Sequence, residues 1–154
     1  MTLPPLDVRF DTSTPDEIER HLRACDHLFQ APLSARIGIR GYAEKLARSA
    51  RRVEAWDGTM LVGLVASYVN ADAAELFVSN VSVLEERSGQ GLATRLMRLA
   101  LDDAGQSGCT SARLEVSEEA AAANRLYKGL GFEDAGSGTT GNRTLKTSLL
   151  RSTP

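Results

Sequence analysis

Two glycines, Gly89 and Gly91, offer the clearest chemistry in this sequence. A stretch rich in β-forming residues, 76–84, precedes them, and from Leu92 apolar residues recur at the spacing of a helix. A strand, a glycine turn and a helix bring free backbone N–H groups and a helix N-terminus to one place. The pattern predicts an anion site, above all for phosphate, although such a turn is as often only a tight connection.

Two common phosphate-binding motifs do not fit this stretch. A nucleoside-triphosphate loop has Lys and then Ser or Thr directly after a glycine, and no such pair follows Gly89 or Gly91. The third glycine of a dinucleotide-binding motif would fall on Thr94. The glycine turn therefore predicts a phosphate site of a kind other than these two.

The composition narrows the class of protein. The chain has 154 residues, of which 42% are hydrophobic and 25% charged, and this predicts one globular domain over residues 1–154. The net charge of −2 gives no support for nucleic-acid binding, and no apolar run is long enough to span a membrane. The N-terminus lacks the pattern of a signal peptide, so we expect a cytoplasmic protein.

The cysteines and histidines do not form a metal-binding pattern. Cys25 lies on an apolar helical stripe and Cys109 at the entrance to a strand, and no second ligand stands at metal spacing from either. We therefore expect no metal site and no disulfide framework. A Cys-His nucleophile would need His21 or His27, and packing explains Cys25 better.

The elements around the glycine turn follow an α/β pattern. Asp57-Gly58 is a strong hairpin signal, so three antiparallel strands lead into the turn. The strand before the turn, the helix after it and the strand 112–116 form a βαβ unit, which makes these two strands parallel. We expect strands at 8–10, 52–56, 60–69, 75–84, 112–116, 132–134 and 143–150, and helices at 14–29, 39–50, from 92 to about 104 and 117–129.

Four motifs in a fixed order carry a family resemblance. They are Asn80-Val-Ser-Val83, Gly89-Gln-Gly91-Leu-Ala93, Leu114-Glu-Val116 and Ala123-Asn-Arg-Leu-Tyr127-Lys-Gly-Leu-Gly131-Phe132. With them the chain resembles the GCN5-related N-acetyltransferase (GNAT) superfamily over nearly its whole length. The resemblance implies an α/β fold: a mixed sheet of six or seven strands with about four helices. Its central parallel strands would splay apart around acetyl-coenzyme A.

The resemblance assigns two stretches to acetyl-coenzyme A. The amide-rich pantetheine arm would pair with backbone groups of Val81, Ser82 and Val83. The pyrophosphate would accept hydrogen bonds from backbone N–H groups in and around the glycine turn. The residues of this second stretch are Ser88, Gly89, Gln90, Gly91, Leu92, Ala93 and Thr94.

Two positions depart from the family pattern. Ser88 stands where the family has Arg or Gln, and Ala120 where it often has Asn. Because the main contacts are made by the backbone, we expect weaker cofactor binding at most. Asn124 lies one turn after Ala120 and would supply the polar contact, unless it is only a solvated helix residue.

The implied reaction is direct attack of a primary amine on the thioester. Tyr127 matches the family's Tyr beside the cofactor sulfur and is the candidate acid for the leaving thiolate. A backbone N–H near Val81, where the family carries a bulge, would bind the oxyanion. Glu75 has the spacing of the catalytic Glu in the histone-acetyltransferase branch and is the candidate base. A water chain held by Ser79, Asn80 or Ser82 is the alternative.

The acceptor pocket is expected from the first two helices, the loop 30–40 between them and the loop 136–142. They contain or adjoin Arg36, Arg40, Tyr42 and Arg143, which suit a carboxylate or a phosphate, and they lack an acidic cluster for a polyamine or aminoglycoside. We expect the acetyl group to go to an amine of a small molecule, such as an amino sugar or an amino acid. The alternatives are a protein or peptide N-acetyltransferase and a non-catalytic acyl-coenzyme A sensor. Homodimers are common in the family, and nothing in the sequence fixes the number of subunits.

Overall fold

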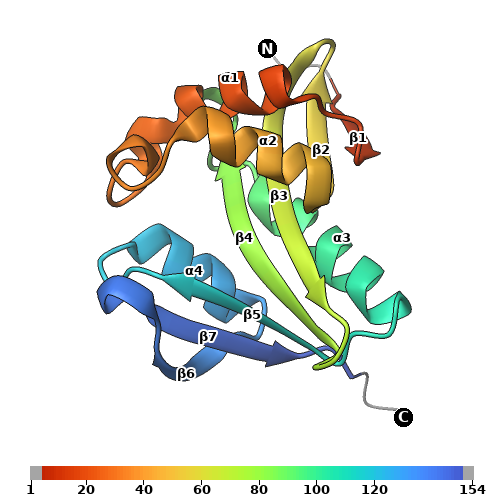
Figure 1. Cartoon of the computed structure of the whole chain (residues 1–154), viewed down its shortest axis with the longest axis vertical. Coiled ribbons are helices and arrows are strands. Elements are labelled where there is room, and N and C mark those ends of the chain that lie inside the picture. The colour runs from red at the N-terminus through yellow and green to blue at the C-terminus, as the bar shows by residue number, and fades with distance from the viewer. Residues whose placement is uncertain (1–4, 151–154) are drawn as a thin grey trace.

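The computed structural model describes residues 5–150 and places seven strands among them in one mixed sheet (Figure 1). The sheet order is β1-β2-β3-β4-β5-β7-β6, and every neighbouring pair is antiparallel except β4 and β5. This confirms the α/β mixed sheet predicted from the sequence. The strands are β1 (Asp7–Phe10), β2 (Arg51–Asp57), β3 (Met60–Asn70), β4 (Glu75–Val83), β5 (Ser111–Val116), β6 (Glu133–Ser137) and β7 (Arg143–Ser148).

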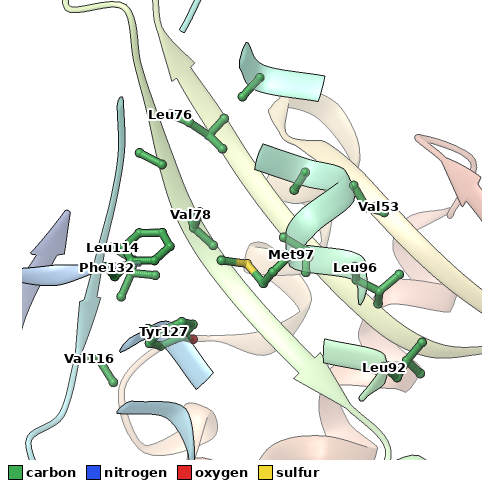
Figure 2. Packing of buried hydrophobic residues seen from close by; sticks show 14 of the residues in the cluster. Val53, Leu76, Val78, Leu92, Leu96, Met97, Leu114, Val116, Tyr127 and Phe132 are labelled. Carbon is green, nitrogen blue, oxygen red and sulfur yellow. The ribbon is translucent and has the colours of Figure 1, made fainter. Parts of the chain in front are cut away.

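Four α-helices of the described chain cover the two faces of the sheet. α1 (Pro15–Cys25) and α2 (Ile39–Ser49) lie on one face, and α3 (Leu92–Gln106) and α4 (Ala121–Gly129) on the other (Figure 1). Each face has its own apolar cluster, one built on Leu22, Leu46 and Leu64 and the other on Met97 and Leu114. Figure 2 shows the second cluster, between α3, α4 and the centre of the sheet. Between residues 5 and 150, no helix has the length and apolar character needed to cross a membrane.

Two helix boundaries differ from the sequence prediction. α1 begins as expected, because Thr14 and Glu17 form a reciprocal capping box, but it ends at Cys25 and continues as a 3₁₀ turn (Asp26–Leu28). α4 begins later than expected, with Ala120 at its N-cap position. Ser117 does not cap the helix, because its hydroxyl accepts from the Glu119 N–H within the preceding turn.

A β-bulge at Ser79 divides β4 into two parts. Asn80 pairs with Ala66 and Val78 with Ser67, so Ser79 is the extra residue. One extra residue exchanges the two faces of a strand. Val78 therefore packs in the α3–α4 cluster, whereas Asn80 two residues later is buried on the α1 side. The predicted bulge near Val81 was wrong by two residues, since regular alternation in the sequence gives no sign of the inserted position.

The parallel pairing of β4 and β5 is short. It joins residues 75–78 of β4 to residues 111–114 of β5 and then stops, while β4 stays paired with β3 as far as Val83. In Figure 1 the two strands start together and part toward the loop between α1 and α2. This confirms the predicted splay, and it leaves residues 79–83 of β4 with an unpaired edge.

A buried ion pair fixes the N-terminal part of the sheet. Glu54 is completely buried and lies 3.4 Å from Arg52, and it also accepts hydrogen bonds from Thr12, Ser13 and Trp56. Burial would raise the pKa of Glu54, but the hydrogen bonds from Ser13 and Thr12 outweigh it and hold the pKa below its ordinary value. This network ties the segment before α1 to β2.

Candidate active site

The glycine turn is open toward solvent, although the N–H of Ser88, just before it, already donates to the Glu85 carbonyl at 3.1 Å. Gly89 and Gly91 both have φ of +75°, and a Cβ at either position would meet no atom within 4 Å. Gly91 is the N-cap residue of α3, and no side chain caps this helix. The first N–H groups of α3 therefore have no intrahelical acceptor. Free donors, the positive end of a helix and an open approach together fit a small anion such as a pyrophosphate.

No long side chain replaces the missing Arg or Gln of this turn. The Ser88 hydroxyl donates to the Glu85 carbonyl at 2.7 Å and only stabilises the turn. Arg87, the nearest basic residue in the sequence, is buried and points away, with its guanidinium 3.0 Å from Asp57. The donors at residues 89–94 are consequently those of the backbone.

A chain of hydrogen bonds lies beneath the unpaired edge of β4. The Asn80 amide donates to Ser82 Oγ at 2.9 Å, Ser82 Oγ lies 2.8 Å from His21 Nε2, and His21 Nδ1 lies 2.9 Å from the Leu61 carbonyl. Since a carbonyl only accepts, Nδ1 carries the proton and Nε2 accepts from the Ser82 hydroxyl. Burial lowers the pKa of His21 to about 4, so the ring is neutral at pH 7. The network holds this part of β4 against α1.

The same network shows that Cys25 is a packing residue. Its thiol lies 3.7 Å from His21 Nε2 but is 1% exposed. Burial raises the pKa of Cys25 to about 12, so the thiol remains protonated and is a poor nucleophile.

Two of the three predicted holders of a water chain are not available. Asn80 and Ser82 are buried and hydrogen-bonded within the network, which removes them as holders of a water chain in an accessible site. Ser79 is the predicted holder that stays half-buried.

Tyr127 lies where β4 and β5 part. Its ring belongs to the same cluster as Val78 and Leu114, the last residues of the parallel ladder, and meets Phe132 edge-on at 6.0 Å (Figure 2). The side chain is 8% exposed, and burial raises the pKa of its hydroxyl to about 12. The hydroxyl makes no hydrogen bond within residues 5–150. It therefore keeps its proton at neutral pH and is free to donate it to a ligand.

Asn124 is already engaged within the chain. Its side-chain amide nitrogen donates to the carbonyls of Ser117 and Ala120, each at 2.9 Å. These bonds close the turn before α4. Only the side-chain oxygen of Asn124 is left for a cofactor, so the residue cannot donate as the family's Asn would without breaking the turn.

Glu75 lies at the paired end of β4, four residues before the bulge. Its carboxylate lies 3.1 Å from both Arg113 and Lys146. Burial alone would raise the pKa of Glu75, but hydrogen bonds from these two cations outweigh it and hold the pKa below its ordinary value. Four strand residues span about 13 Å. A low pKa and this distance both argue against Glu75 as the general base.

The predicted acceptor residues divide into engaged and available groups. Arg40 pairs with Asp16, Glu19 and Glu44, and Arg143 pairs with Asp134 and Glu118. Tyr42 turns its hydroxyl to Ser79 Oγ at 2.6 Å, which brings α2 to the bulge. Arg36 makes no ion pair among the described residues and lies near enough to Tyr42 to lower its pKa, although burial raises that pKa overall to about 12.

The loop after α1 reaches across to the far half of the sheet. Gln30 donates a hydrogen bond to Glu119, before α4, at 3.0 Å. In Figure 1 this loop stands opposite the β5–α4 connection, across the parting strands. A surface depression of about 550 Å³ lies elsewhere, beside β6 and β7, and none of the predicted cofactor residues lines it.

Solved structures of low sequence identity share this fold. The ribosomal-protein-S18-alanine N-acetyltransferase of Escherichia coli is 20% identical and matches with a TM-score of 0.71, over 97% of each chain. A GNAT-family acetyltransferase of Staphylococcus aureus is 10% identical, with a TM-score of 0.75 over 94% of this chain and all of that one.

A third solved structure of this fold contains coenzyme A. An aminoglycoside 6'-N-acetyltransferase complexed with coenzyme A is 14% identical, with a TM-score of 0.73 over 91% of this chain and 93% of that one. No curated protein matches the chain in sequence. The sequence model of the acetyltransferase (GNAT) family, however, matches residues 16–132. The chain therefore belongs to the acetyltransferase (GNAT) family and is an acyltransferase whose acyl donor is acetyl-coenzyme A.

Proposed function

We propose that the protein transfers the acetyl group of acetyl-coenzyme A to a primary amine of a small molecule, by direct attack in a ternary complex. One observation carries the proposal: the protonated Tyr127 hydroxyl has no hydrogen-bond partner among residues 5–150 and lies at the point where β4 and β5 part. A thiolate that leaves the thioester needs a proton donor, and Tyr127 offers one where the unpaired edge of β4 begins.

The binding of the donor rests on two features of the chain. The unpaired edge of β4, with Val81, Ser82 and Val83, offers backbone groups to the amides of the pantetheine arm. Backbone N–H groups at 89–94 would hold the pyrophosphate. Bound there, acetyl-coenzyme A supplies an activated thioester.

The residues around the bulge would act on the reacting groups. Ser79 is the extra residue of the bulge, so a backbone N–H at this point is the candidate donor to the carbonyl oxygen of the thioester. Tyr127 would give its proton to the leaving sulfur. For the proton of the amine we favour a water molecule held by Ser79 and Tyr42 over the ion-paired Glu75.

The test is release of free thiol from acetyl-coenzyme A in the presence of a panel of small primary amines. We expect turnover with at least one amine, and about 100-fold lower kcat in Tyr127→Phe, because a general acid contributes roughly 10²-fold or more. Calorimetry supplies the control: the variant should bind acetyl-coenzyme A as tightly as the wild type.

Other results would contradict the proposal in distinguishable ways. Tight donor binding without turnover on any amine or peptide would favour a sensor. Turnover confined to peptides would favour a protein N-acetyltransferase. A single domain over residues 1–154 and location in the cytoplasm stay predictions from the sequence, and the number of subunits stays open.

A further inference from the structure

Two aromatic rings lie side by side on the sheet face that carries α1 and α2. Tyr68 on β3 stands directly opposite Phe77 on β4, and Phe77 pairs in turn with Arg113 on β5. The other flank of the pair is closed by Lys45 of α2. These four residues, Lys45, Tyr68, Phe77 and Arg113, are called the cationic–aromatic surface below.

Both cations lie over the rings. Lys45 Nζ is 5.4 Å from the centre of the Tyr68 ring, and Arg113 Cζ is 4.8 Å from that of Phe77. A ring face attracts a cation but carries no net charge, so it does not neutralise one. Lys45 makes no ion pair within residues 5–150. Arg113 uses its Nε for Glu75, which leaves both terminal nitrogens as donors.

Positive charge prevails around this surface. Glu75 is shared between Arg113 and Lys146. Glu115, two residues after Arg113 on β5, accepts the hydrogen bonds of Thr139. Arg48 lies close enough to Tyr68 to act on its pKa, which burial nevertheless raises. With Lys45 and Arg48 added, these cations outnumber the two carboxylates, so the surface attracts an anion and repels a polycation.

The Tyr68 hydroxyl adds a spare hydrogen-bond donor. Its oxygen is buried and has no hydrogen-bond partner among the described residues. A buried hydroxyl without a partner is uncommon, because leaving it unpaired costs free energy that a ligand oxygen could recover.

The surface lies next to the reaction centre deduced above. Phe77 precedes the bulge residue Ser79 by two positions, about 7 Å along the strand. A small molecule can therefore place its amine near Ser79 and an anionic group near Arg113 or Lys45. A carboxylate suits the planar fork of an Arg side chain, which can donate two parallel hydrogen bonds.

We propose that the cationic–aromatic surface binds the carboxylate of the acceptor, so that the acceptor is an amino acid or a similar small amine with a carboxylate and an apolar body. This inference rests on the proposed acetyltransferase function. It excludes polyamines and aminoglycosides as the preferred acceptors of this protein.

The experiment compares acceptors that share a side chain and differ in the carboxyl group. Phenylalanine, leucine and methionine are each tested beside their amide and their decarboxylated amine, as kcat/KM for thiol release. We expect the wild type to prefer the acid over the amide at least tenfold. The Lys45→Gln/Arg113→Gln double variant should lose about tenfold of that preference, through a higher KM for the acid. Arg98→Gln, an exposed residue of α3, is the matched control and should keep the preference.

A second measurement needs no turnover. Calorimetry with the N-acetylated acid and the N-acetylated amide should show tighter binding of the acid to the wild type, and equal binding of the two to the double variant. Three results would overturn the carboxylate site. They are equal binding of the N-acetylated acid and amide to the wild type, a higher kcat/KM for spermidine than for any acid, and a preference for a phosphorylated amine. Turnover of acid and amide alike would overturn this inference and leave the acetyltransferase function standing. Selective binding of the acid without turnover of any amine would contradict the acetyltransferase function and leave the carboxylate site standing.

Discussion

The two ends of β4 differ in their strand pairing and in the faces to which their side chains point. From 75 to 78 the strand is paired on both sides, and its one charged residue, Glu75, is matched by Arg113 and Lys146. From 79 to 83 it is paired on one side only, and its side chains have exchanged faces. The first part anchors the sheet, and the second presents a backbone edge to a ligand.

The open end has a support that the paired end does not need. A strand edge without a neighbour normally gains little support from its own ladder. Here the side chains of Asn80 and Ser82 lie beneath the strand and are hydrogen-bonded in series to His21 of α1. Each of the three side chains donates to an acceptor. The buried polar network therefore takes the place of the missing β5 contacts and keeps the edge in position.

Deleting Ser79 should have the largest effect, because it removes the difference between the two ends. The residues after the deletion would change faces, which places the polar Asn80 and Ser82 in the apolar cluster and turns Val81 and Val83 away from it. We expect a loss of about 5 kcal/mol or more in the free energy of unfolding, enough to unfold the protein. Urea denaturation measures it.

The substitution Ser79→Ala is the control for the deletion. It keeps the backbone count and removes only the hydrogen bond with Tyr42, so about 1 kcal/mol should be lost. A deletion variant as stable as Ser79→Ala would show that the bulge does not set the faces of β4.

Gly91→Asp should strongly weaken the binding of acetyl-coenzyme A at the glycine turn that follows the open end. A carboxylate in the turn would stand about 5 Å from a bound pyrophosphate, and their repulsion would cost about 3 kcal/mol, roughly 100-fold in Kd for acetyl-coenzyme A. Calorimetry measures the change. Gly108→Asp is the control, since Gly108 also has a positive φ, of +102°, and lies beyond the other end of α3. Equal Kd values for the two variants would rule out the anion site at 89–94.

The His21 network should make the open end sensitive to acid. The pKa of His21 is about 4 in the folded protein and 6.5 ordinarily, so the unfolded chain binds the proton first as the pH falls. The stability from the neutral ring is therefore complete above pH 6.5 and decreases by about 3 kcal/mol as the pH falls toward 4. Urea denaturation between pH 7 and pH 4 shows the loss.

His21→Gln should remove that part of the pH dependence, because an amide can make both hydrogen bonds without titrating. His27→Gln is the matched control, since His27 is 61% exposed and pairs only with Glu85. It should leave the acid-dependent loss in place. An unchanged pH profile in His21→Gln would contradict the role of the network.

Glu75→Gln should have the smallest effect on kcat, because Glu75 takes no part in the proton transfers proposed here. We expect kcat to change by less than about threefold and stability by at most about 1 kcal/mol, as for other partly exposed ion pairs. Steady-state kinetics from pH 6 to 9 checks this. A 100-fold loss of kcat that grows at low pH would return Glu75 to the role of general base.

Much of the fold was predictable, because the signals were local. The Asp57-Gly58 hairpin, the capping box at Thr14 and the apolar period after Leu92 each specify one element, and the structure has all three. The limits of α1 and α4 were less well predicted. Their ends depend on turns that hold neighbouring segments together, such as the bonds of Asn124 to Ser117 and Ala120.

The sequence by itself determined the order of the elements, the glycine turn and the presence of Tyr127, since each depends on residue type and spacing within a few turns of chain. Tertiary structure alone decided which groups are free to act. It paired Glu75 with Arg113 and Lys146, turned Arg87 toward Asp57, and placed Tyr68 beside Phe77. These partners lie far apart in the sequence, and one inserted residue, Ser79, sets which of them share a face. Burial, charge pairing and register are properties of the assembled sheet, so no local pattern reports them.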